Sequence, residues 1–261
     1  MKITYWADFA CPYCYIGETR LLKAVKKLGM EDSIELQMKS YELNPDAPKE
    51  CTGTTAERYA KSMKLGPKGA EYHVDRVSRL GRMEGLEMDY AKSRYTNTLD
   101  AHRLLKAAQL NGDKETTEKL INNLFDAYFA KGLELSDRDT LIKIGVESGL
   151  VKNDIINILE SDKFTDEVRA DEKEADEAEA YGVPFFIIGN KRLEGAVEEN
   201  AFITAVNEAM KKEHNEDEII FDEMDLDNVS HDETESVADD AHKNIADDNH
   251  EHGCSDGVCR L

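Results

Sequence analysis

The sequence predicts a mixed α/β domain that is interrupted by a block of helices and followed by an acidic tail. Three observations support this fold class: a strand–helix–strand pattern opens the chain, a long helical stretch follows, and a strand–strand–helix pattern returns afterwards. We expect the α/β domain to comprise residues 1–50 and 182–212. The inserted helical domain would comprise residues 51–181, and the tail residues 213–261.

The opening unit reads as strand, helix, strand. Residues 2–9, KITYWADF, form the apolar and β-branched run that is typical of a buried strand. Apolar residues then recur at helical spacing from Ile16 to Leu28, with Pro12 suited to the first turn and Gly29 to the end. Alternating apolar residues in 33–44, SIELQMKSYELN, predict the second strand.

The remaining elements follow from the same patterns. Residues 54–181 have a helical pattern with few interruptions, from which we expect five to seven helices that need partners for their apolar faces. Residues 182–190, GVPFFIIGN, predict a strand, and residues 191–195 predict its hairpin partner across the turn Gly189-Asn190. Residues 196–212 predict the last helix.

The charge distribution argues against a nucleic-acid-binding protein. The net charge is −22, and residues 213–261 carry 17 acidic and 2 basic residues, so most of the excess lies in the tail. No basic patch suits nucleic acid or an anionic membrane surface. No apolar run resembles a signal peptide or reaches the roughly 18 residues of a membrane span. We therefore expect a soluble cytoplasmic protein without nucleic-acid or membrane partners.

The two cysteines Cys11 and Cys14 stand where the first strand meets the first helix. A sulfur at the start of a helix faces unpaired N–H groups and the positive end of the helix dipole, which favour the thiolate. Cys11 could then attack a disulfide, and Cys14, one turn deeper, could resolve the mixed disulfide. The alternatives are a buried structural pair and half of a zinc site. The redox reading needs neither an organic cofactor nor a metal.

A second close pair, Cys254 and Cys259, lies near the end of the tail. The intervening Ser-Asp-Gly favours a turn, and the tail between it and the last helix is long enough to span a domain. Our hypothesis is that this pair exchanges with Cys11 and Cys14. The rivals are a zinc site with His250 and His252, or an inert tail. The fifth cysteine, Cys51, has no evident partner.

Four motifs in order carry a resemblance to a known family: DFACPYCYIG, SYELNPDAP, NTLDAHRLLKAA and GVPFFIIG with LEGA. Together they resemble the DsbA-like thioredoxin superfamily, and within it the FrnE-type cytosolic thiol–disulfide oxidoreductases. The resemblance covers residues 1–212. It implies a thioredoxin fold with an inserted helical domain, and thiol- or disulfide-containing proteins or small thiols as substrates.

The resemblance also assigns roles to residues. Cys11 would be the nucleophile, Cys14 the resolving thiol, and Pro184 the cis-proline beside them. The resemblance implies substrate contacts by five residues: Pro12, Tyr13, Val183, Asn97 and His102. For Asn97 and His102 the alternative is a solvated helix face.

Two further side chains have two readings each, and a third departs from the family pattern. Asp8 could accept a proton from Cys14 or simply cap a loop, and Trp6 is a core or crevice residue. Val197 stands where the family pattern has glutamine.

The same superfamily offers an alternative activity. Kappa-type glutathione transferases and 2-hydroxychromene-2-carboxylate isomerases share the inserted-domain architecture but generally carry serine in place of the first cysteine. The presence of both Cys11 and Cys14 argues against that class. A zinc-binding, redox-sensing interaction protein is the other alternative.

Overall fold

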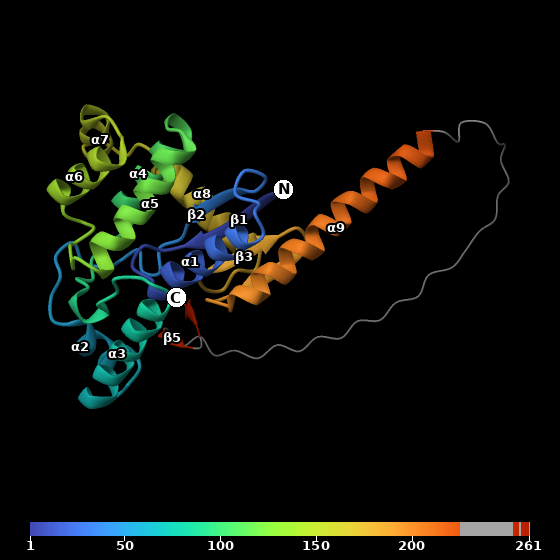
Figure 1. Ribbon diagram of the computed structural model, residues 1–261. Coiled ribbons are helices and arrows are strands. Elements are labelled where there is room, and N and C mark those ends of the chain that lie inside the picture. The colour runs from blue at the N-terminus through green and yellow to red at the C-terminus, as the bar shows by residue number, and fades with distance from the viewer. Residues whose placement is uncertain (225–252, 256, 261) are drawn as a thin grey trace.

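The fold was described from a computed structural model, which describes residues 1–224, 253–255 and 257–260. A four-stranded sheet lies at its centre, with the strand order β2-β1-β3-β4 (Figure 1). β1 (Lys2–Ala7) pairs in parallel with β2 (Glu35–Ser40) and antiparallel with β3 (Phe185–Ile188), which pairs antiparallel with β4 (Lys191–Glu194). The predicted hairpin is confirmed, with Gly189 at φ +57° in its turn.

Helices cover both sides of this sheet. α1 (Pro12–Lys27) and α9 (Glu199–Met224) pack beside each other, and α8 (Thr165–Glu177) packs on β2 (Figure 1). The described part of α9 runs twelve residues beyond the end that the sequence pattern predicts. Residues 213–224 contain neither Gly nor Pro, so nothing in them stops a helix.

The insertion between β2 and β3 is helical, as expected. Most of its helices lie on the side of the sheet away from α9 (Figure 1). In chain order before α8 they are α2 (Thr55–Ser62), α3 (Pro67–Met83), the 3₁₀ turn Tyr90–Lys92, α4 (Leu99–Asn111), α5 (Lys114–Phe129), α6 (Arg138–Ser148) and α7 (Lys152–Leu159). Thr54 and Glu57 form a capping box at the start of α2.

The core continues from the sheet into the insertion. Tyr5 stacks on Phe186, and Phe186 contacts the ring of Phe202 from α9 edge-on at 4.8 Å between centroids. On the other side, Phe9 contacts the ring of Phe125 from α5 at 5.1 Å. Because β1 and the residues after it contribute to both packing regions, the insertion and the sheet share one hydrophobic core.

α8 is also fastened to the sheet by polar contacts. The carboxylate of Asp171 accepts a hydrogen bond of 2.7 Å from the Ser40 N–H and pairs with Lys106 of α4. The indole N–H of Trp6 donates to the Asp171 carbonyl at 2.8 Å, so Trp6 is a core residue with a satisfied donor. These bonds hold α4 and α8 against the ends of β1 and β2.

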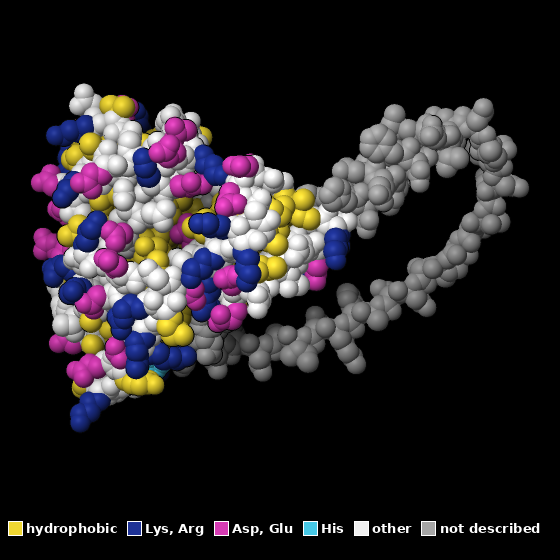
Figure 2. Space-filling model, viewed as in Figure 1, with side chains coloured by type: hydrophobic (Ala, Val, Ile, Leu, Met, Phe, Trp, Pro, Cys, Tyr) yellow, Lys and Arg dark blue, Asp and Glu magenta, His cyan; other side chains and the backbone are white. Residues whose placement is uncertain are grey.

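Two small strands of the tail lie against the domain. β5 (Gly253–Ser255) and β6 (Val258–Arg260) form an antiparallel hairpin in which Cys254 and Cys259 are opposite each other (Figure 1). None of the described helices is long and apolar enough to cross a membrane. On the face seen in Figure 2, basic and acidic side chains are interspersed over the domain.

Candidate active site

The dithiol stands at the junction of β1 and α1. Cys11 is the N-cap of α1, and its N–H donates to the Asp8 carbonyl at 3.0 Å, which turns the chain from strand to helix. Pro12 and Tyr13 form the first helical turn and are buried. Cys14 follows one turn in, and both cysteines are buried free thiols. As the N-cap, Cys11 stands at the positive end of the α1 dipole, and its side chain makes no capping hydrogen bond.

The two thiols differ in their surroundings. Burial raises the pKa of the Cys14 thiol well above its ordinary value, and the hydrogen bond to Cys11 and the charge of Cys11 raise it further. Cys14 is thus held as the protonated partner that donates to the Cys11 sulfur. A nucleophile at the start of the helix, backed by a protonated second thiol, is the arrangement that two-step disulfide exchange requires.

The second wall of the site comes from the loop before β3. The Val183–Pro184 peptide bond is cis, and the Cys11 thiol lies 3.7 Å from the Val183 carbonyl oxygen. Gly17 lets α1 approach this loop, because a Cβ there would lie 3.1 Å from Pro184 Cγ and 3.2 Å from the Phe186 ring. The dithiol and the residue before the cis-proline, 172 residues apart, therefore form one site.

The tail hairpin occupies this wall. The Val183 N–H donates to the Cys259 carbonyl at 2.7 Å, and the Cys259 N–H donates to the Val183 carbonyl at 2.8 Å. A third bond of 2.8 Å runs from the Ala196 N–H to the Gly257 carbonyl. Cys259 is fully buried and disulfide-bonded. The chain thus presents its own C-terminal strand to the backbone groups that border Cys11.

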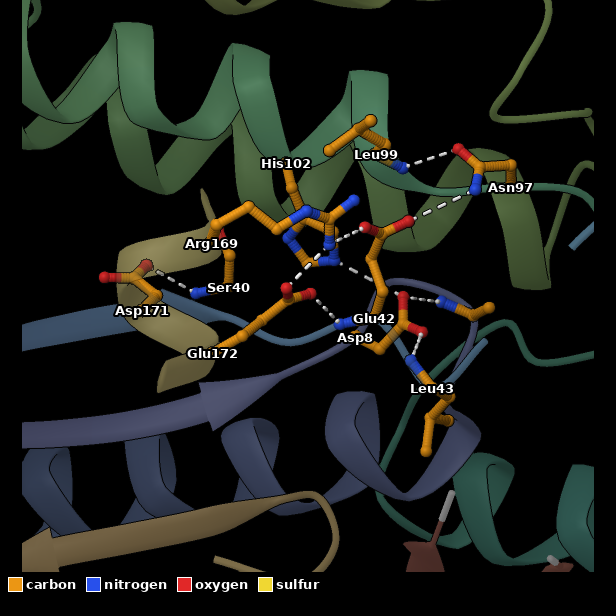
Figure 3. Close-up of polar contacts among 11 residues, drawn as sticks. Asp8, Ser40, Glu42, Leu43, Asn97, Leu99, His102, Arg169, Asp171 and Glu172 are labelled. Carbon is orange, nitrogen blue, oxygen red and sulfur yellow. Dashed lines mark hydrogen bonds and ion pairs between the residues drawn. The ribbon is translucent and has the colours of Figure 1, made fainter. Parts of the chain in front are cut away.

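Asp8 anchors the loop that leads into Cys11. One carboxylate oxygen accepts from the Ala10 N–H at 3.1 Å, and the other accepts from the Leu43 N–H at 2.8 Å (Figure 3). His102 of α4 approaches the same carboxylate, with Nε2 3.4 Å from Oδ1. Of the two readings of Asp8, these contacts describe the loop-capping carboxylate.

We expect Asp8→Ala to destabilise the fold by about 2–3 kcal/mol, because one buried and one partly buried N–H group lose their acceptor. Asp8→Asn keeps one carbonyl oxygen and should cost about half as much. Urea unfolding of the two variants tests this, with the exposed Asp139→Ala as the control. Equal stability of wild type and Asp8→Ala would contradict the anchoring role.

A partly buried polar network extends from Asp8 toward the insertion. Glu42 accepts hydrogen bonds from Asn97 Nδ2 at 3.2 Å and from Arg169 at 2.7 Å, and Asn97 Oδ1 accepts from the Leu99 N–H at the start of α4 (Figure 3). Burial raises the pKa of Glu42, while nearby His102 and Arg169 lower it. The network joins α4 and α8 to the end of β2.

The network bears on two of the predicted substrate contacts. Asn97 uses its side chain on Glu42, the Pro45 carbonyl and the cap of α4, and His102 is fully buried against Phe9. We therefore leave Asn97 and His102 out of the proposed substrate groove. The contacts predicted for Pro12, Tyr13 and Val183 stay predictions, with all three residues beside the dithiol.

Sequence reasoning missed one titratable pair below the dithiol. Glu18 of α1 is buried, and the Tyr5 hydroxyl donates to its Oε1 at 2.5 Å. Burial raises the pKa of Glu18 to about 7, although the Tyr5 hydrogen bond opposes the rise. The signal was present, because Cys14, Glu18, Leu21 and Val25 share one helix face and the other three are apolar.

We expect Glu18→Gln to stabilise the protein at high pH. The raised pKa means that folded Glu18 keeps its proton from its ordinary value of 4.5 up to about 7, whereas the unfolded chain releases it. Wild-type stability should therefore fall across this window by up to about 3 kcal/mol, and the variant should lack that fall. Urea unfolding between pH 4 and 8 tests this, and parallel pH dependences would contradict it.

The fold and the dithiol define a thioredoxin-like oxidoreductase class, and the comparisons agree. The model of the DsbA-like thioredoxin domain matches residues 2–207, so the chain belongs to that family. It is similar to the uncharacterized protein YwbO of Bacillus subtilis, with 24% identity over 81% of this chain and 98% of YwbO.

Solved structures repeat the fold. A probable DsbA oxidoreductase from Streptomyces coelicolor is 28% identical with a TM-score of 0.75, covering 81% of this chain and 90% of that one. The cytosolic disulfide reductase DsbM from Pseudomonas aeruginosa, solved with GSH, has a TM-score of 0.53 at 13% identity, covering 83% and 98%. A 2-hydroxychromene-2-carboxylate isomerase has a TM-score of 0.55 at 16% identity, covering 87% and 100%.

Proposed function

We propose that the protein is a FrnE-type, cytoplasmic thiol–disulfide oxidoreductase whose Cys11–Cys14 site exchanges with a disulfide between Cys254 and Cys259. The observation that carries the proposal is the pairing of Cys259 with Val183, which borders Cys11. Cys11, Cys14 and Cys51 are free, so Cys254, opposite Cys259 in the hairpin, is the remaining partner for the disulfide at Cys259.

Exchange with a substrate proceeds in two displacements. The Cys11 thiolate attacks one sulfur of the substrate disulfide, which forms a mixed disulfide and releases the other sulfur as a thiolate that takes up a proton. Cys14 then loses its proton and attacks the Cys11 sulfur, so the Cys11–Cys14 disulfide forms and the second substrate thiolate leaves. The substrate gains two electrons, and the reverse sequence oxidises a substrate dithiol.

The tail cysteines would react with the active site by the same thiol–disulfide exchange. If the oxidised Cys11–Cys14 pair accepts two electrons from the Cys254–Cys259 dithiol, the products are two free thiols at the active site and a disulfide in the tail. This distribution is the one that the described cysteines have, with Cys11 and Cys14 free and Cys259 disulfide-bonded. A tether makes such an exchange intramolecular, with an effective concentration of about millimolar.

The alternatives find less support. Kappa-type or isomerase chemistry would use bound glutathione, and that class generally carries serine in place of Cys11. No group of three or more potential metal ligands occurs among the described residues, but His250 and His252 lie outside them, so a tail zinc site stays a prediction.

A redox titration tests the proposal. In glutathione buffers of graded potential, alkylation of Cys11 and Cys14 should disappear together as one two-electron couple, since they form one disulfide. Cys51, which is half-buried and whose thiol donates to the Gly53 carbonyl at 3.8 Å, should titrate independently. Failure of Cys11 and Cys14 to oxidise as a pair would refute the proposed activity.

A further inference from the structure

A cavity of about 430 Å³ lies between α1, β2 and α5. Its volume falls in the range of roughly 300–1,000 Å³ that is usual for small-molecule sites. Neither Cys11 nor Cys14 is among the described residues that line it. The cavity is therefore distinct from the candidate active site.

The walls of this cavity are largely apolar. On α1, Leu22 and Val25 lie four and seven positions after Glu18, so the three side chains share one helix face. Six apolar side chains line the cavity: Leu22, Val25, Ile34, Leu36, Met38 and Ile121. All of them except Leu22 and Leu36 are buried. A ligand that fills this space needs an apolar body.

Glu18 is the buried polar group of the cavity. Its side chain lines the cavity although the residue is only 6% exposed. The Tyr5 hydroxyl donates to Oε1 at 2.5 Å, whereas Oε2 has no hydrogen-bond partner among the described residues. A buried carboxyl oxygen without a donor costs free energy, which a donor on a ligand would recover.

The charge around the opening is mostly negative. Four exposed carboxylates also line the cavity: Glu31, Glu35, Asp113 and Glu118. Lys114 is the one basic residue among the described residues that line it, and it is already paired. Its Nζ donates to the Glu31 carbonyl at 3.0 Å and lies 3.8 Å from Oε1 of Glu118. The cavity therefore favours a cation over an anion.

We propose that this cavity binds a small amine with an apolar body, and that the protonated amino group pairs with the Glu18 carboxylate. The ammonium group donates to Oε2, and the apolar body packs between α1, β2 and α5. An anionic ligand would instead meet five carboxyl groups, and a neutral ligand would leave the Glu18 charge unpaired. The site does not depend on the proposed disulfide exchange.

Isothermal titration calorimetry of the full-length chain at pH 8 tests the site with three probes. Phenethylamine has both the charge and the apolar body, 2-phenylethanol lacks the charge, and ethylamine lacks the ring. Phenethylamine should bind at least about tenfold more tightly than either of the others. Equal affinity for ethylamine would indicate only a cation attracted to an acidic surface. Equal affinity for 2-phenylethanol would indicate apolar burial without an ion pair, and either result overturns the inference.

Binding should also be coupled to the ionisation of Glu18. Burial raises the pKa of Glu18 to about 7, and the charge of Glu118 adds to the rise. A paired ammonium group favours the ionised carboxylate, so binding near pH 7 should release a proton. The apparent binding enthalpy should then depend on the ionisation enthalpy of the buffer. The affinity should fall by at least about tenfold between pH 8 and pH 5.5. Binding without proton release would contradict pairing with Glu18.

A charge-removing variant locates the ligand. Glu18→Gln keeps the shape of the side chain but should bind phenethylamine no more tightly than 2-phenylethanol, without proton release. Glu71→Gln, at an exposed position on α3, is the control and should match the wild type. A preference for the amine that survives in Glu18→Gln overturns the inference. The proton release of the wild-type chain decides the question if Glu18→Gln does not fold.

Discussion

Cys11→Ser is expected to abolish catalysed disulfide exchange, lowering the rate by about a thousandfold or more. A serine hydroxyl does not ionise near neutral pH, so no nucleophile would remain at the start of α1. The fold should survive, because serine is a favoured N-cap and Cys11 now makes no side-chain cap. Insulin reduction measures the rate, and urea unfolding measures the stability.

The matched control is Cys51→Ser, which removes a thiol outside the site and should leave the rate unchanged. Glutathione binding by Cys11→Ser separates the two enzyme classes. If the variant still binds glutathione and catalyses a glutathione-dependent isomerisation or transfer, the kappa-type alternative is right. If it retains disulfide exchange, Cys11 is not the nucleophile.

Opening the turn of the tail hairpin is expected to expose Cys11. Three backbone hydrogen bonds hold the hairpin on the domain, and each contributes about 0.5–1.5 kcal/mol. Docking should therefore slow the alkylation of Cys11 by about tenfold or more. Gly257 has φ +83°, and a Cβ there would contact the Ala196 N–H nitrogen at 3.4 Å. Gly257→Val should therefore weaken docking while keeping every cysteine in place.

The measurement is the rate of Cys11 alkylation by iodoacetamide in the two full-length chains, followed by peptide mass. Cys51 serves as the internal reference, because it lies outside the site and its rate should not change. Alkylation of Cys11 that is equally fast in wild type and Gly257→Val would contradict a tail that covers the site in solution.

Local patterns predicted much of the fold. The strand–helix–strand opening, the β3–β4 hairpin and the helical insertion follow from periodicity and from turn residues, and the family match covers residues 2–207. The sequence pattern did not predict the end of α9. The acidic residues after 212 have the composition of a tail, although they are compatible with a helix. An acidic composition indicates exposure to solvent, but it does not show where a helix ends.

The site was predictable only where motifs mark it. Cys11, Cys14 and Pro184 carry a family pattern, but the contact of Asp8 with His102 joins residues 94 apart and leaves no local periodicity. The bridge from Val183 to Cys259 is of the same kind, because it depends on backbone groups that every residue has. Side-chain identity cannot specify such a partner.

The central claim is that the tail exchanges with the active site, and a trapping experiment tests it most directly. Full-length Cys14→Ser lacks the resolving thiol, so any bond that Cys11 makes should persist. After mild oxidation with oxidised glutathione, peptide mapping should find Cys11 linked to Cys259, whose backbone borders the Cys11 thiol through Val183. A free or glutathionylated Cys11 beside an intact Cys254–Cys259 disulfide would contradict the account.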